Sequence, residues 1–131
     1  MRDITTKFGT NAGKIYEILN EKGKLQKEKI INLTSLNDKD LHSAIGWLAR
    51  ENKISEENEN QYKLDSHTNL VPKIGSYAGR VYKIIDIWEE VDLTTIKRLS
   101  DLDDDEIYEA LGWLAREDKI VIDKEQKLKL K

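Results

Sequence analysis

The sequence has no cysteine and a single proline among its 131 residues. Without cysteine there can be no disulfide framework, no thiolate metal site and no cysteine nucleophile. No apolar run approaches the roughly 18 residues that are needed to span a bilayer. Residues 1–10 also lack the apolar stretch of a secretory signal. We therefore expect a cytoplasmic protein that does not enter a membrane.

A surplus of positive charge is also missing. The chain has 22 basic and 25 acidic residues, which give a net charge of -3. A dedicated nucleic-acid binder usually has a basic surplus, because contacts to phosphates supply most of its non-specific affinity. The balance of charge therefore weighs against a protein whose main task is to hold DNA or RNA.

The motifs of common enzyme classes are absent as well. The sequence contains no His-Glu-x-x-His, no Gly-x-Ser-x-Gly and no glycine loop that could cradle a phosphate. The acidic run from Asp101 to Glu106 has neither the spacing nor the glycine of a calcium loop, and we interpret it as the solvated start of a helix. We expect no enzymatic activity, no cofactor, no metal ion and no small-molecule substrate.

The dominant feature that is present is an internal repeat. Gly9 falls on Gly75, and this offset of 66 residues continues without a gap to the end of the chain. The stretch Gly46–Glu51 is identical to Gly112–Glu117 in all six residues, Gly-Trp-Leu-Ala-Arg-Glu. The repeat divides the chain into module 1 (residues 1–64), a linker (65–73, with Pro72) and module 2 (74–131). Modules this small bury too little surface to be stable alone, so we expect them to pack on each other or to dimerise.

Each module has the pattern of three helices followed by a hairpin. In module 1, apolar residues at helical spacing predict helices over 11–22, 28–33 and 38–51, with Gly23 as a C-cap and Asn37 as an N-cap. A short strand is expected over 25–27, and strands over 53–56 and 61–64 flank a polar turn. In module 2 the cap is the pair Asp103 and Glu106, and the strands are 119–122 and 127–130. This order is that of a winged helix-turn-helix, a mainly α fold with small β-wings.

The same residues resemble a known family. Ala-Gly-x-x-Tyr at Ala12–Tyr16, followed by Ala-x-Gly-Trp-Leu-Ala-Arg-Glu-x-Lys-Ile at Ala44–Ile54, is similar to a small prokaryotic winged helix-turn-helix family of uncharacterised role. Both halves have the pattern, so the resemblance covers nearly the whole chain. It implies the fold and brings no established activity or substrate with it.

The third helix is the element that a DNA-binding winged helix places in the major groove. In module 1, the side opposite its apolar face offers four candidate DNA contacts: Lys39, His42, Ser43 and Arg50. The equivalent positions of module 2 include Asp105 and Glu109, which phosphate would repel. Residues 8–64 of module 1 include nine basic and nine acidic residues, whereas residues 74–131 of module 2 include ten basic and fourteen acidic ones. Direct DNA contact is therefore more plausible for module 1 than for module 2.

Several residues are candidates for a protein interface, and they are Trp47, Trp113, Ile87, Trp88 and Arg116. The repeated Gly-Trp-x-x-Arg could form a partly exposed platform, since Trp and Arg are favoured at interfaces. The alternative is that each indole packs under the wing, with the adjacent glycine letting another element approach. Ile87 and Trp88 replace Glu21 and Lys22 of module 1. This change predicts an inter-module or homodimer interface centred on these two residues.

These patterns lead to two functional hypotheses. The first is a non-enzymatic regulatory or assembly protein that acts mainly through protein contacts, with a protein partner or a second copy of itself. The alternative is a transcriptional regulator that contacts duplex DNA through the third helix and wing of module 1.

Overall fold

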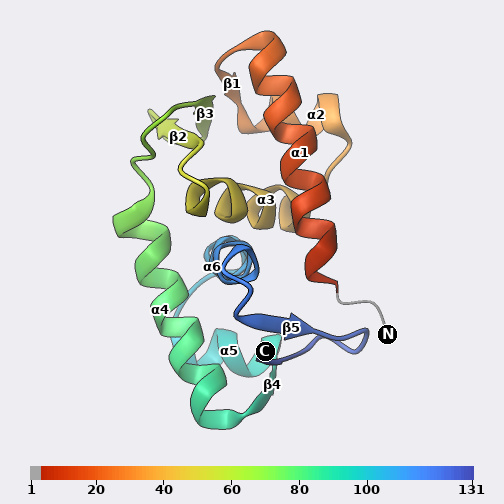
Figure 1. Ribbon diagram of the computed structural model, residues 1–131, viewed down its shortest axis with the longest axis vertical. Coiled ribbons are helices and arrows are strands. Elements are labelled where there is room, and N and C mark those ends of the chain that lie inside the picture. Colours follow the sequence, from red (N-terminus) through yellow and green to blue (C-terminus); the bar gives the residue numbers. More distant parts are fainter. Residues whose placement is uncertain (1–3) are drawn as a thin grey trace.

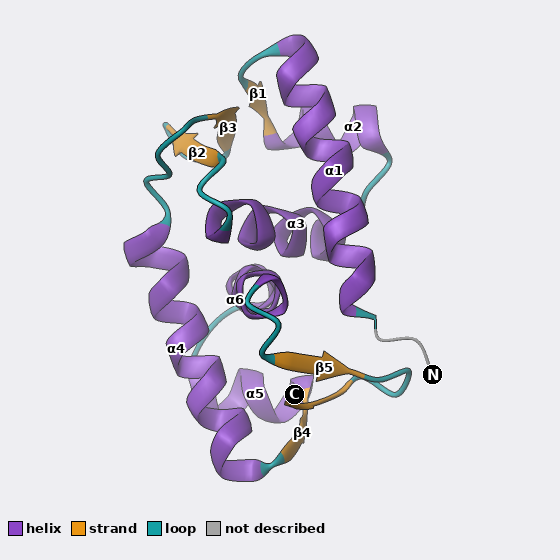
Figure 2. Ribbon diagram, viewed as in Figure 1, coloured by secondary structure: helices purple, strands orange, loops and turns teal. Residues whose placement is uncertain are grey.

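The computed structural model describes residues 4–131, and the two halves have the same order of elements (Figures 1 and 2). Module 1 consists of α1 (Thr5–Lys22), β1 (Leu25–Gln26), α2 (Lys27–Thr34), α3 (Asp38–Arg50), β2 (Ile54–Glu57) and β3 (Gln61–Leu64). Module 2 consists of α4 (Val71–Trp88), β4 (Glu90–Asp92), α5 (Leu93–Ser100), α6 (Asp104–Arg116), β5 (Ile120–Ile122) and β6 (Lys127–Leu130). The predicted tandem winged helix-turn-helix fold is confirmed.

Each wing is a three-stranded antiparallel sheet in which the last strand lies in the middle. The strand orders are β1-β3-β2 and β4-β6-β5, and equivalent residues pair in both sheets, as in Ile54 with Leu64 and Ile120 with Leu130. The central strands bury Tyr62 and Leu128. The short strand after the first helix therefore completes the predicted hairpin and ties it to the helical part of the module.

The helix ends follow the predicted capping residues. The Asn37 side chain accepts a hydrogen bond from the backbone N–H of Asp40 at 2.8 Å. Asp103 accepts from the N–H of Glu106 at 2.9 Å, and the Glu106 carboxylate accepts from the N–H of Asp103 at 3.0 Å, which makes a full capping box. Gly23 ends α1 with φ = 80°, a conformation that favours glycine.

Both first helices are longer than the sequence indicates. Helix α1 begins at Thr5 instead of residue 11, and α4 begins at Val71, so the last three residues of the predicted linker form its first turn. Pro72 lies in that first turn, where the absence of its N–H breaks no helical hydrogen bond. Residues 65–70 connect the modules, and the last of them, Leu70, is buried.

The two modules pack on each other as expected, with one helix from each at the centre. Figure 1 shows α3 and α6 side by side in the middle of the molecule, with α1 and α4 flanking them on opposite sides. Phe8 of α1 belongs to the hydrophobic core of module 2, and its repeat counterpart Ile74 of α4 belongs to the core of module 1. This reciprocal exchange explains the length of both helices, because their first turns are buried against the other module.

Candidate functional site

The third helices, α3 and α6, cross in direct backbone contact. Helix α3 runs across the view of Figure 1, while α6 is seen end-on. A Cβ atom at Gly46 would overlap the carbonyl oxygen of Glu109, and a Cβ atom at Gly112 would overlap that of Ser43. Because backbone atoms are overlapped, no side-chain rearrangement could relieve either clash. Glycine at these two positions is what allows the helices to approach this closely.

This crossing separates the four candidate DNA contacts into two groups. His42 and Ser43 lie inside the inter-module interface, 4% and 0% exposed. The Ser43 hydroxyl donates to carbonyl oxygens of its own helix, those of Lys39 and Asp40. Lys39 and Arg50 are exposed. In this arrangement, only Lys39 and Arg50 of the four candidates, near the two ends of α3, are accessible to a DNA groove. The residues between them on the same face are covered by α6.

The repeated arginine and glutamate make reciprocal ion pairs across the crossing. Arg50 Nε donates to Glu117 Oε2 at 3.0 Å, and Arg116 Nε donates to Glu51 Oε2 at 2.9 Å. Each arginine is 45% exposed and each glutamate is under 20% exposed. The pairs therefore lie at the rim of the interface, related by the same pseudo-twofold symmetry that relates the modules.

The tryptophans take part in the same reciprocal arrangement. The guanidinium of Arg116 lies 5.9 Å from the centre of the Trp47 ring, and the indole also lies against Gly9 of α1, where a Cβ atom would come within 2.9 Å of it. The equivalent set is Trp113, Arg50 and Gly75. The prediction that glycine lets another element approach is confirmed, but that element is the other module's third helix, and the indole packs against a first helix. The Gly-Trp-Leu-Ala-Arg-Glu identity thus marks residues that contact their own repeat.

One edge of the crossing is closed by charged groups, and we call it the sealed edge; it consists of Lys27, His42, Asp105 and Glu109. His42 Nδ1 lies 2.7 Å from Glu109 Oε2, and both residues are at most 5% exposed. Asp105 Oδ2 lies 3.4 Å from His42 Nε2 and 3.5 Å from Lys27 Nζ. Module 1 supplies Lys27 and His42 and module 2 supplies the two carboxylates, so each carboxylate, including that of the buried Glu109, has a partner from the other module.

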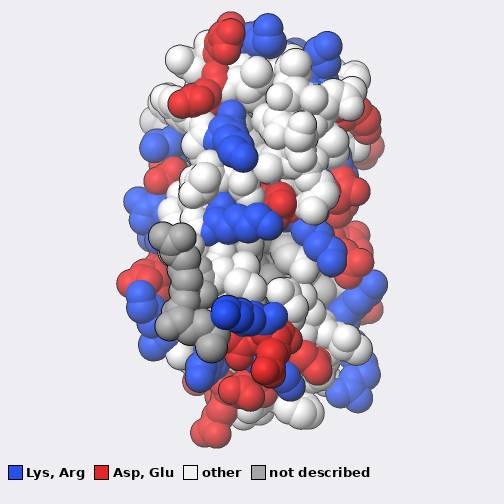
Figure 3. All heavy atoms as spheres, turned by 90° about the vertical axis from the view of Figure 1, so that its right-hand side faces the viewer, with Lys and Arg blue, Asp and Glu red and all other residues white. Residues whose placement is uncertain are grey.

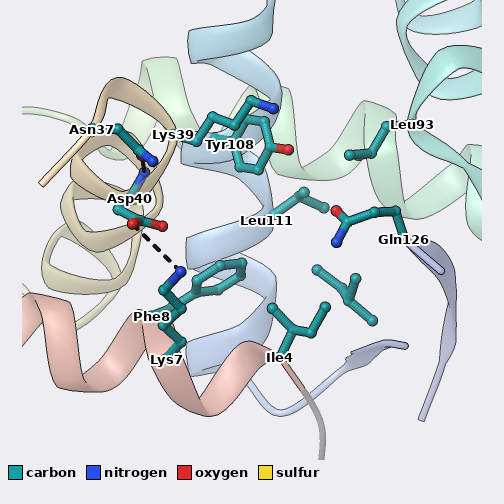
Figure 4. Close-up of a pocket in the computed structure, with 11 residues that line it drawn as sticks. Ile4, Lys7, Phe8, Asn37, Lys39, Asp40, Leu93, Tyr108, Leu111 and Gln126 are labelled. Carbon is teal, nitrogen blue, oxygen red and sulfur yellow. Dashed lines mark hydrogen bonds and ion pairs between the residues drawn. The ribbon is translucent and has the colours of Figure 1, made fainter. Parts of the chain in front are cut away.

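The pseudo-symmetric positions form the open edge, which consists of Leu93, Tyr108, Lys39 and Ser43. A cavity of about 290 Å³ lies here, between the start of α1, the start of α3, α6 and the second wing (Figure 4). Its apolar lining includes Phe8, Leu111 and Ile122. The same scaffold is therefore closed by charge at one edge and hollow at the other.

The structure leaves Ile87 and Trp88 outside the inter-module contact. They lie in the last turn of α4 and are 76% and 50% exposed. Figure 1 shows this end of α4 at the far end of module 2 from α3. The inter-module half of the sequence hypothesis is therefore wrong for this arrangement, because the modules meet at α3 and α6 instead. The homodimer half stays a prediction.

The described surface has mixed charge. On the face shown in Figure 3, basic side chains are separated by neutral and acidic surface, and an acidic group lies over the lower module. Within residues 4–131, no group of three His, Cys, Asp or Glu side chains is placed to hold a metal ion. None of the helices described there is both long and apolar enough to cross a membrane.

The sequence did not reveal the roles of Lys27, Asp105 and Glu109. The sequence placed these two carboxylates on the helix face that would meet a DNA groove, whereas they face module 1. A signal was present in the repeat itself: at positions 39/105 and 43/109 a residue on the same helix face changes charge between copies. The carboxylates that appear only in module 2 face Lys27 and His42 of module 1, so this change of charge accompanies a contact between the modules.

Comparison with known proteins agrees with this architecture. A family model described as "Winged helix-turn-helix domain (DUF2582)" matches twice, over residues 1–64 and 65–130. The chain belongs to this family. An uncharacterised protein of Methanocaldococcus jannaschii is 48% identical over 56 residues, which are 41% of this chain and 80% of the relative. No solved structure matches the chain. The relative has the length of about one module, so this chain contains two copies of a unit that also occurs singly.

Proposed function

We propose that this protein is a non-enzymatic regulatory or assembly module that acts mainly through protein contacts. The observation that supports the proposal is the mutual burial of α3 and α6. A helix that is buried on nearly every side is a core element, and here the elements that would read a DNA groove hold the two modules together. His42, Ser43 and Glu109 are all within this core.

The alternative, duplex DNA binding through α3 and the wing of module 1, requires the modules to separate or to bind through Lys39 and Arg50 alone. Separation would break the His42–Glu109 contact and expose Phe8 and Ile74. Arg50 is already paired with Glu117. Two exposed cations make a small phosphate-binding surface, since the affinity of non-specific binding rises with the number of phosphates neutralised.

DNA titration distinguishes the two functions. We expect a labelled mixed-sequence duplex to bind more weakly than about 1 μM at moderate salt, with no change in Lys39→Glu or Arg50→Glu. Salt-dependent affinity tighter than micromolar that is lost in either variant would reject the proposal in favour of the alternative.

The contact surface that we propose for self-association is formed by Ile87 and Trp88. These large apolar side chains are exposed on one turn of α4, and an exposed Trp beside an aliphatic residue is typical of protein interfaces. Module 1 has Glu21 and Lys22 at the same positions, which are also exposed. The module 2 residues are therefore not needed by the fold, which leaves contact with another chain as their proposed role.

Solution mass tests this surface. We expect the wild-type mass to rise with protein concentration, and the variant Ile87→Glu with Trp88→Lys, which restores the module 1 residues, to stay monomeric with unchanged thermal stability. A wild-type protein that is monomeric at all concentrations, or a variant with the same mass as wild type, would refute self-association through this surface.

A further inference from the structure

The two edges of the α3–α6 crossing differ in how their charged groups are paired. At the sealed edge, the Asp105 carboxylate lies within 3.5 Å of two cationic partners, Lys27 and, when protonated, His42. Lys39 occupies the position equivalent to Asp105 at the open edge. Its ammonium lies 5.9 Å from the centre of the Tyr108 ring, and within residues 4–131 it forms no ion pair. The open edge therefore has a cation without an ion-pair partner where the sealed edge has a carboxylate paired with the other module.

The cavity beside Lys39 has an apolar floor and a polar rim. Phe8, Leu111 and Ile122 are all buried and line it from three different elements, α1, α6 and β5. Figure 4 shows Lys39 and Tyr108 together on one side of the cavity and Gln126 pointing into it. This combination of apolar walls with a few convergent polar groups, located between domains, is typical of small-molecule sites.

The charge of the rim favours an anion. Two lysines and one carboxylate line the cavity, and that carboxylate, Asp40, is paired with Lys7 at 3.5 Å. Burial, with Asp104 and Asp40 nearby, raises the pKa of Tyr108 above its ordinary value. Its O–H therefore stays protonated at neutral pH and can donate a hydrogen bond.

The volume limits the size of the occupant. A cavity of about 290 Å³ is at the small end of ligand sites and would hold about ten non-hydrogen atoms, at roughly 30 Å³ for each water-sized group. A second hollow of about 260 Å³ shares Lys39, Leu93 and Tyr108 as walls, so the site continues along the edge.

We propose that the open edge binds a small organic carboxylate with an apolar body, an aromatic or branched-chain acid. The carboxylate accepts hydrogen bonds from Lys39 and Tyr108, and the body packs against Ile4 and Leu93, the partly exposed aliphatic residues of the lining. Because the site is lined by both modules, the bound acid stabilises their contact. This inference does not depend on the proposed protein contacts, since it concerns a different face of the molecule.

Binding can be measured on the full chain by NMR. Benzoate and 3-methylbutanoate are titrated into uniformly ¹⁵N-labelled protein, with benzyl alcohol as the uncharged probe. We expect saturable shifts at residues around the cavity, with a dissociation constant of about 1 mM or tighter for at least one acid. The alcohol should bind at least about tenfold more weakly, because it cannot make the charge-assisted hydrogen bond.

A matched pair of variants tests the role of Lys39. Lys39→Asp inserts the residue that stands at this position in module 2; since it lies in the first turn of α3, a carboxylate suits the helix dipole and folding is preserved. We expect this variant to bind the acids at least about tenfold more weakly. Lys14→Asp, on an exposed part of α1 outside the cavity, should bind like wild type.

Three results would each overturn the proposal. The first is that neither acid gives saturable shifts at the cavity up to about 20 mM. The second is that Lys39→Asp binds as tightly as wild type. The third is that benzyl alcohol binds as tightly as benzoate, which would show an apolar hollow without anion recognition.

Discussion

The two modules are most alike and most different at the same interface. Where the repeats are identical, at Gly46–Glu51 and Gly112–Glu117, the close glycine contact and the arginine–glutamate pair are each made twice, once in each direction. Where they differ, at the four positions of each edge, one edge is filled by a His–Glu pair and the other is hollow. The identical residues are therefore the ones that contact their own repeat, and the residues that differ give the molecule two unlike edges.

The largest effect is expected at the crossing itself. Gly112→Ala places a methyl group on the backbone of α3, so the helices must move apart, and we expect a loss of about 3 kcal/mol or more in the free energy of unfolding. Urea unfolding measures it. Gly79→Ala is the matched control, because nothing lies within 4 Å of that site and alanine favours the helix by up to about 1 kcal/mol. A Gly112→Ala protein within 1 kcal/mol of wild type would contradict the close crossing.

The sealed edge should give the next largest effect. His42→Ala leaves the Glu109 carboxylate buried without a partner, which costs about 3 kcal/mol. The double variant His42→Tyr, Glu109→Ser has the residues of the open edge at the sealed edge. Its loss in the free energy of unfolding should be smaller, by at least about 1 kcal/mol, than the sum of the losses in the two single variants. A four-protein unfolding cycle measures the coupling.

The open edge provides the control for that cycle. Tyr108→Phe and Ser43→Ala alter the equivalent pair, which makes no mutual hydrogen bond, so their effects should add within about 0.5 kcal/mol. If the coupling free energies measured at the two edges were equal, the proposed difference between the sealed edge and the open edge would be wrong.

The smallest effect is expected where the modules are symmetric and exposed. Arg50→Ala removes a rim ion pair and a contact with Trp113, at a cost of about 0.5–1 kcal/mol that shrinks in 1 M salt. Arg116→Ala should lose the same amount, because its contacts are the mirror set. Urea unfolding at low and high salt measures the stability loss in each variant. A difference of more than about 1 kcal/mol between the two losses would contradict the equivalence of the two ion pairs.

Much of the fold could be predicted from the sequence because its signals are local. The spacing of apolar residues predicts the helices, and the capping residues Asn37 and Asp103 predict where the third helix of each module begins. The repeat extends the prediction for one module to the other. The first turns of α1 and α4 could not be found in this way, because Phe8 and Ile74 are stabilised by the other module and not by their own sequence neighbours.

The site was harder to predict for a related reason. His42, Ser43 and Glu109 are polar, and a polar helix face in a single module is ordinarily interpreted as exposed. Only the placement of the second copy shows that this face is buried. Gly46 and Gly112 did indicate a close approach, but a glycine does not identify the element that approaches it.

Amide hydrogen exchange tests most directly whether α3 and α6 form one shared core. We expect the amides of residues 43–49 and 109–115 to exchange only through global unfolding, with the same free energy in both helices. Gly112→Ala should lower that free energy equally in both helices. Faster exchange in one of the two helices, through an opening that leaves the other protected, would show that the modules separate while folded and would contradict the account.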